Sequence, residues 1–227
     1  MITYIPNFLS AEDVAPLVAQ LADAAFAEGA ATAGWHAREV KKNQQLIHGM
    51  PGHEPLEKAV RAVLLRNPTF QMAARPRYIA PIIFNRYETG MNYGRHVDEP
   101  LMNIAGASPS HLRSDISFTL FLTDPAAYEG GELIIGSGGV EQSFKQPAGT
   151  LIAYPSSTIH RVMPLTSGVR LAAIGWVQSE IRDPAQRAIV YDLDRVRRGI
   201  YGKEGKTDAF DLLTKCHANL LRMWAEL

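Results

Sequence analysis

Hydrophobic residues in the first 76 positions recur every three to four residues, which is typical of amphipathic helices. A capping-box pattern at Ser10 begins one helical stretch, and Gly29 and Gly34 are expected to end it. A second stretch begins near Pro55, a residue that suits the first turn of a helix. The pattern predicts two helices in this segment, and residues 35–41 are predicted to add a strand.

From about residue 77 the pattern changes to short runs rich in β-branched and aromatic residues, separated by Gly, Pro, Ser and Asp. Many short strands divided by turns are typical of a β-sandwich or jelly roll. The Gly-rich stretches 130–131 and 136–139 are interpreted as hairpin turns, because they lack the lysine and the helix of a phosphate loop. We expect strands at 78–87, 93–97, 116–122, 132–135, 150–154, 160–163 and 170–178.

After residue 179 the chain becomes charged and helical in pattern, first over 184–198 and then in a last helix that Asp208 is expected to cap. We expect the apolar stripe of this last helix to pack on the strand core. The alternative is a helix that forms a homodimer, because periodicity does not identify the partner. The stripe consists of Phe210, Leu213, His217, Leu220, Leu221 and Trp224.

The hydrophobic pattern therefore predicts a mainly β fold with flanking helices, in three parts. Residues 1–76 form a helical and strand segment that packs on the core, residues 77–179 form the strand core, and residues 180–227 form a helical extension. A chain of 227 residues, 46% of them apolar, is long enough to bury one substantial core.

Charge and cysteine content restrict the partners and the compartment. Lys plus Arg and Asp plus Glu number 23 each, so no net field favours nucleic acid or an anionic membrane, and we expect neither as a partner. There is no secretory signal pattern or membrane-spanning apolar run, and Cys216 is the only cysteine, which together favour a cytoplasmic protein. A bound metal must therefore rely on imidazole and carboxylate groups.

Such a metal-binding pattern occurs at His96 and Asp98, two residues apart in a predicted strand. Residues i and i+2 of a strand point to the same face, so both side chains can contact one ion. His160 begins another predicted strand about sixty residues later, and a sandwich can bring it to the same end. Two histidines and one carboxylate on one face leave the opposite positions open, which is the pattern of non-haem iron(II) oxygenases.

Arg170 follows His160 by ten residues. A strand that leaves the metal, turns at Ser167-Gly168 and returns would place this guanidinium beside the metal site, several ångströms deeper. There it can bind a carboxylate through two parallel hydrogen bonds. This arrangement suits a dicarboxylate whose other end chelates iron.

The remaining histidines and two polar segments complete the candidate groups. Residues 41–45 and 99–112 are expected to border the substrate opening, and 99–112 is a candidate lid. The other histidines have no partner at metal-ligand spacing and are expected to be surface or packing residues; they are His36, His48, His53, His111 and His217.

Several motifs in one order make the chain resemble the 2-oxoglutarate and iron(II)-dependent dioxygenases, specifically the bacterial PKHD-type hydroxylases, which are related to the prolyl 4-hydroxylase catalytic domain. These motifs lie at residues 84–87, 90–98, 113–122, 128–133, 154–162, 168–170 and 176–179. The resemblance implies a double-stranded β-helix, or jelly roll. It implies His96, Asp98 and His160 as iron ligands and Arg170 as the group that holds the far carboxylate of 2-oxoglutarate. Tyr87 is expected to contact this co-substrate, with Tyr93 as a second candidate.

The implied reaction hydroxylates an unactivated C–H bond of an unidentified small-molecule or peptide substrate, using dioxygen and converting 2-oxoglutarate to succinate and carbon dioxide. The resemblance also suggests ascorbate as a supporting reductant and an association with bacterial iron uptake. Two alternatives are a redox-neutral cupin-like metalloenzyme and a non-catalytic iron-binding protein. Arg170 argues against the redox-neutral metalloenzyme, because such an enzyme needs no cation beside the metal to bind a co-substrate.

Overall fold

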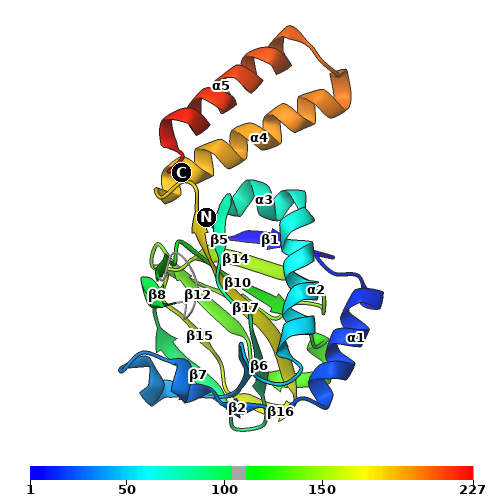
Figure 1. The fold of residues 1–227 in the computed structure, drawn as a ribbon, viewed down its shortest axis with the longest axis vertical. Coiled ribbons are helices and arrows are strands. Elements are labelled where there is room, and N and C mark those ends of the chain that lie inside the picture. The colour runs from blue at the N-terminus through cyan, green and yellow to red at the C-terminus, as the bar shows by residue number, and fades with distance from the viewer. Residues whose placement is uncertain (104–110, 227) are drawn as a thin grey trace.

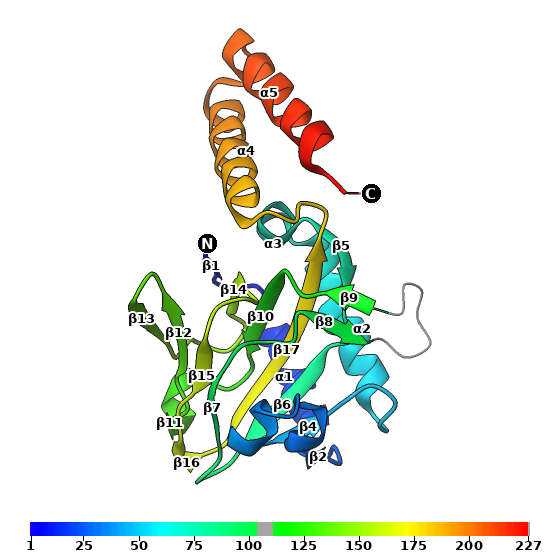
Figure 2. The same ribbon diagram turned by 90° about the vertical axis from the view of Figure 1, so that its left-hand side faces the viewer.

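The computed structural model describes residues 1–103 and 111–226, in which two antiparallel sheets face each other (Figure 2). The major sheet has the order β1-β14-β10-β17-β6-β4-β2, with β5 paired to β17. Its strands are β1 (Thr3–Ile5), β2 (Ala27–Glu28), β4 (Gln44–Leu46), β5 (Pro76–Ile79), β6 (Ile83–Tyr87), β10 (Ile116–Phe121), β14 (Leu151–Pro155) and β17 (Arg170–Ser179). The minor sheet, β13-β12-β15-β7-β3, consists of β3 (Lys41–Lys42), β7 (Asn92–His96), β12 (Leu133–Ser137), β13 (Val140–Phe144) and β15 (His160–Val162).

Two further strand pairs lie at the margins of the sheets. They are β8 (Leu101–Asn103) with β9 (His111–Arg113), and β11 (Tyr128–Gly130) with β16 (Leu165–Gly168). Short 3₁₀ turns are η1 (Gly29–Thr32), η2 (Ala37–Val40) and η3 (Pro125–Ala127). Antiparallel pairing throughout two facing sheets is the arrangement predicted for a jelly roll.

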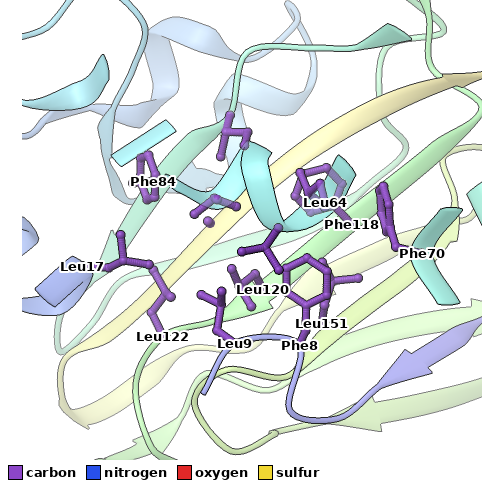
Figure 3. Packing of buried hydrophobic residues seen from close by; sticks show 14 of the residues in the cluster. Phe8, Leu9, Leu17, Leu64, Phe70, Phe84, Phe118, Leu120, Leu122 and Leu151 are labelled. Atoms are coloured by element: carbon purple, nitrogen blue, oxygen red, sulfur yellow. The ribbon is translucent and has the colours of Figure 1, made fainter. Parts of the chain in front are cut away.

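Three helices lie beside the outer face of the major sheet (Figure 1): α1 (Ala11–Ala22), α2 (His53–Arg66) and α3 (Pro68–Ala74). The predicted capping box begins α1, since the Ser10 side chain accepts from the Asp13 N–H and Asp13 accepts from the Ser10 N–H. Apolar side chains of these helices and of the major sheet form one buried cluster. Figure 3 shows part of it: Phe8, Leu9, Leu17, Leu64, Phe70, Phe84, Phe118, Leu120, Leu122 and Leu151.

The side chains of the central strand β10 alternate between the two faces of the major sheet, and every residue of the strand is buried. Phe118 and Leu120 point to the helices and belong to the cluster of Figure 3. Phe121 belongs to a second apolar cluster between the two sheets, and Ser117 and Thr119 line the pocket there. Alternation along one strand thus supplies the hydrophobic core and the pocket wall together.

Several predicted boundaries were wrong. Helix α1 ends at Ala22 rather than Gly29, because residues 27–28 pair with β4. The strand expected at 78–87 is divided into β5 and β6 around Pro81, which has no N–H for a ladder. The region 35–41, expected to be a strand, is mostly the turn η2, and α3 was not predicted. The stretch 130–131 is not a hairpin turn, because β11 pairs with β16, whereas β12 and β13 do form a hairpin.

The two C-terminal helices, α4 (Pro184–Glu204) and α5 (Asp208–Trp224), form a hairpin that extends beyond the sheets (Figures 1 and 2). The expectation that the α5 stripe packs on the strand core was therefore wrong: α5 packs on α4. His217 is the buried residue of α5, with its Nε2 2.9 Å from Arg75 Nη2. The N-cap of α5 is Thr207 rather than Asp208. After α5 the chain returns to the β-domain, where Glu226 N donates to Glu180 O at 2.7 Å.

The candidate lid segment 99–112 falls only partly within the described residues, since 104–110 lie outside them. At its two ends β8 and β9 pair as antiparallel strands.

None of the helices in the described part of the chain has both the length and the apolar character needed to cross a membrane.

Candidate metal centre and its pocket

A pocket of about 400 Å³ opens between the two sheets. Strands β6, β10 and β17 of the major sheet and β7 and β15 of the minor sheet contribute to its wall. All five residues predicted for the site line this pocket: His96, Asp98, His160, Arg170 and Tyr87. Tyr93, the second candidate tyrosine, lines it as well.

The two histidines come together because β7 and β15 pair directly, with His160 opposite His96. Asp98 follows the end of β7. Its Oδ1 lies 3.9 Å from His96 Nε2, and its Oδ2 lies 3.8 Å from His160 Nε2. The three ligand atoms lie within 4.8 Å of one another, and both histidines are buried. A single divalent ion fits such a group of two imidazoles and one carboxylate.

The backbone fixes the protonation of both imidazoles. His96 Nδ1 donates to Gly94 O at 2.8 Å, and His160 Nδ1 donates to Thr158 O at 3.0 Å. Because Nδ1 carries the proton in each ring, the Nε2 lone pairs point toward Asp98. Backbone carbonyls are common outer partners of metal-binding histidines, since they set both ring orientation and tautomer.

Asp98 is oriented by a serine pair. Ser117 Oγ on β10 donates to Asp98 Oδ2 at 2.5 Å and lies 2.8 Å from Ser156 Oγ. Both serines are buried. Sequence reasoning did not identify Ser117, because its role depends on β10 facing the end of β7 across the two sheets.

Burial and the neighbouring His160 keep the His96 imidazole neutral. Tyr93 stacks on His96 with ring centroids 3.6 Å apart and an interplanar angle of 15°. Burial, followed by the nearby His160, lowers the pKa of His96 to about 4. Burial raises the pKa of Tyr93, so its phenol stays protonated. Neutral imidazole is the form that binds a metal, so this environment suits His96 to act as a ligand.

Arg170 supplies a buried positive charge to the same pocket. Its side chain is 2% exposed, and its Nε and Nη2 atoms have no hydrogen-bond partner among the described residues. The guanidinium lies 5.3 Å from the ring centroids of both Tyr87 and Phe121. The predicted turn is present, since β16 ends at Gly168 with φ of +79° and β17 begins at Arg170. A buried guanidinium with free donors is suited to a carboxylate ligand.

A second cation, Lys41, lines the pocket close to Tyr93. It is 7% exposed, its Nζ donates to Thr32 Oγ1 at 2.9 Å, and it lies 5.1 Å from the Tyr93 ring centroid. Burial lowers the pKa of Lys41 to about 8, although Asp98 acts in the opposite direction. Of the predicted border segment 41–45, Lys41 is the residue that lines the pocket.

Comparison with known proteins identifies the family. The sequence model of the 2OG-Fe(II) oxygenase superfamily matches residues 82–178, and that of the PKHD-type hydroxylase C-terminal domain matches residues 184–226. A PKHD-type hydroxylase of Picosynechococcus sp. is 51% identical over 222 residues, 98% of each chain. The chain belongs to the PKHD-type hydroxylases. A PKHD-type hydroxylase of Acaryochloris marina is 49% identical over 226 residues, 100% of each chain.

Solved structures show that this PKHD-type hydroxylase shares the oxygenase fold. A Pseudomonas putida prolyl-4-hydroxylase matches with a TM-score of 0.53 and 20% identity, over 78% of this chain and 92% of that one. A 2OG-Fe(II) oxygenase family protein of Burkholderia pseudomallei matches with a TM-score of 0.58 and 18% identity, over 77% and 84%. The predicted jelly roll is confirmed, and the protein is a 2-oxoglutarate-dependent dioxygenase that uses iron(II).

Proposed function

We propose that His96, Asp98 and His160 hold the iron(II) of this dioxygenase and that Arg170 binds the far carboxylate of 2-oxoglutarate. The observation that carries the proposal is the buried Arg170 guanidinium, whose Nε and Nη2 have no hydrogen-bond partner among the described residues, in the pocket that also contains the three candidate metal ligands. A dicarboxylate with one end on the metal and the other on Arg170 satisfies both groups.

The bound iron and 2-oxoglutarate, with dioxygen, supply the oxidation of an unactivated C–H bond while 2-oxoglutarate loses carbon dioxide and becomes succinate. The residues of the chain supply position and surroundings. Ser117 orients Asp98, and the carbonyls of Gly94 and Thr158 hold the two imidazoles with Nε2 deprotonated.

Tyr87 is proposed to position the co-substrate together with Arg170. It stands opposite Arg170 in the ladder of β6 and β17, and only 1% of its surface is exposed. Burial raises the pKa of Tyr87, while Arg170 acts in the opposite direction, so the phenol remains a hydrogen-bond donor.

The substrate is proposed to be a small molecule or a peptide side chain that presents oxygen atoms to the pocket. Two hydrogen-bond donors there support this class. Lys41 donates to Thr32, and the buried Trp176 Nε1 has no partner in the described part of the chain. Because 2-oxoglutarate takes part of the 400 Å³, the remaining space suits a single group rather than a bulky ligand.

Iron binding tests the assignment of the ligands. Anaerobic titration of the full chain with iron(II) is expected to give one equivalent at this site in the wild type, and Asp98→Asn and His160→Ala are each expected to lose it. His36→Ala removes an exposed histidine outside the pocket lining and serves as the matched control. Retention of the full wild-type iron stoichiometry and affinity by both ligand variants would contradict the assignment.

Product analysis separates the alternatives. A redox-neutral metalloenzyme would bind iron without any need for 2-oxoglutarate, and a non-catalytic iron-binding protein would yield no succinate.

Ascorbate is proposed as a supporting reductant, which predicts a faster loss of activity over repeated turnovers when it is omitted.

The division of the chain into residues 1–76, 77–179 and 180–227 is also proposed. The two matched regions, 82–178 and 184–226, support the second boundary.

The single exposed thiol, Cys216, supports a cytoplasmic location, since a reducing compartment keeps such a group unpaired. Fractionation of the source cells would test that location.

The projecting hairpin of α4 and α5 is the proposed place of a homodimer contact. Large apolar side chains on it are exposed, including Leu212 at 60%, Met223 at 72% and Val196 at 54%. Light scattering after size exclusion should give twice the chain mass of 25.0 kDa, and a monomer at micromolar concentration would contradict this proposal.

A further inference from the structure

A second group of potential metal ligands lies at the rim of the catalytic pocket. His48 Nδ1 is 3.8 Å and His53 Nδ1 is 3.5 Å from Glu57 Oε2, and the three ligand atoms lie within 4.8 Å of one another. His48 also lines the pocket. The prediction that His48 and His53 have no partner at metal-ligand spacing was therefore wrong.

Local structure explains why the sequence did not reveal this group. His53 and Glu57 are four residues apart on α2 and share one face. His48 precedes the helix, and a turn containing Gly49 and Gly52, with φ of +86° and +82°, brings its ring back beside His53. The His48 and His53 ring centroids are 5.8 Å apart. His53 and Glu57 have helix spacing, but His48 lies outside the helix, so only the folded turn shows that it joins them.

His53 is prepared to act as a ligand. It is 1% exposed, and its Nε2 lies 2.6 Å from Ile82 O, so Nε2 carries the proton and donates. Its Nδ1 therefore presents a lone pair, and this buried atom has no hydrogen-bond partner among the described residues. A carbonyl on one nitrogen and a free lone pair on the other is the arrangement seen above at His96 and His160.

Glu57 is fixed with one oxygen free for the two histidines. Its Oε1 accepts from Arg61 Nη2 at 2.5 Å and from Ile82 N at 3.4 Å. Its Oε2 faces His48 and His53 at distances too long for hydrogen bonds but close to the 3.8 and 3.9 Å found in the catalytic group. One ion between the three atoms would satisfy His53 Nδ1, which otherwise has no hydrogen-bond partner in the described part of the chain.

We propose that His48, His53 and Glu57 form a second site for a divalent transition metal. Two imidazoles and one carboxylate are borderline ligands that suit Zn²⁺, with coordination positions left for water or a ligand. Because His48 is shared between this group and the pocket lining, the ion would lie at the pocket rim. The proposal does not depend on which ion or co-substrate the catalytic group binds.

Zinc stoichiometry of the full-length chain tests this site, measured by calorimetry and by elemental analysis after gel filtration. The wild type is expected to bind two Zn²⁺ per chain, one in each His₂–carboxylate group. His48→Ala is expected to bind one Zn²⁺ per chain. Loss of a residue that only supports a ligand typically lowers metal affinity roughly 10–100-fold, and the loss of His48 as a ligand should lower the Zn²⁺ affinity of the rim group by more than that. The His48 side chain is 72% exposed, so its removal does not disturb the core.

Two controls make the outcome decisive. His36→Ala, which removes another exposed histidine, should still bind two Zn²⁺, and Asp98→Asn should lose the catalytic ion but keep the rim ion. A single equivalent in the wild type that Asp98→Asn loses and His48→Ala keeps overturns the proposal, because the ion would then lie in the catalytic group alone. Two equivalents in His48→Ala, or one in His36→Ala, overturn it as well, because binding would then not depend on this group.

Discussion

Replacing Arg170 by alanine removes the positive charge on which co-substrate binding is proposed to depend. Arg170 is 2% exposed and two of its nitrogens have no partner among the residues that the structure describes, so a carboxylate there would form charge-assisted hydrogen bonds shielded from water. Truncating one partner of such a buried pair lowers the free energy of binding by about 2–5 kcal/mol. Since about 1.4 kcal/mol corresponds to a tenfold change in affinity, a loss in the middle of this range raises the KM for 2-oxoglutarate by roughly two to three orders of magnitude.

The assay follows succinate formation against 2-oxoglutarate concentration, with iron(II) affinity measured separately. Arg170→Ala should retain iron, since it leaves His96, Asp98 and His160 in place. Arg161→Ala is the matched control. This arginine pairs with Glu141 on the surface at 2.6 and 2.7 Å, and its loss should leave KM unchanged. A KM for Arg170→Ala within about threefold of wild type would refute the reasoning, because a buried pair cannot contribute so little.

Three further predictions concern the surroundings of the metal group. Ser117→Ala removes the hydrogen bond to Asp98 and should lower iron affinity roughly 10–100-fold in a chelator competition; unchanged affinity would contradict its orienting role. Gly94→Ala would place a Cβ 2.7 Å from Val40 Cβ and should lower the free energy of unfolding by about 1–3 kcal/mol, with recovery when Val40→Ala is added. Denaturant titrations that show no recovery would argue against this contact. Burial lowers the pKa of Lys41 to about 8, below its unfolded value near 10.4, so the unfolded state binds more protons between these pH values. The stability of the metal-free wild type relative to Lys41→Met should therefore rise by up to about 3 kcal/mol over that range, and a flat difference would contradict the assignment.

The grouping of the three candidate metal ligands was predictable from sequence because it follows from strand alternation. His96 and Asp98 are two residues apart and reach the same side, and His160 begins the strand that pairs with β7. Arg170 was predictable for the same reason, since Gly168 permits the turn that returns the chain. In each case one local rule and one strand pairing were sufficient.

Other features depend on contacts that no periodic pattern specifies. The apolar stripe of α5 was predicted correctly as a stripe, but its partner is α4 rather than the sheets. The prediction of a strand over residues 35–41 failed because η2 turns Val40 against Gly94. Pro68 ends α2 yet also begins α3, since the residue that interrupts one helix suits the first position of the next.

The most direct test of the central claim combines iron(II) and 2-oxoglutarate with the protein in the absence of oxygen. Chelation of both at one site predicts a visible metal-to-ligand charge-transfer band, followed by succinate formation when oxygen is admitted. The band should be lost in His160→Ala and should require much more 2-oxoglutarate in Arg170→Ala. If the wild-type protein shows neither the band nor succinate, the proposed site is wrong.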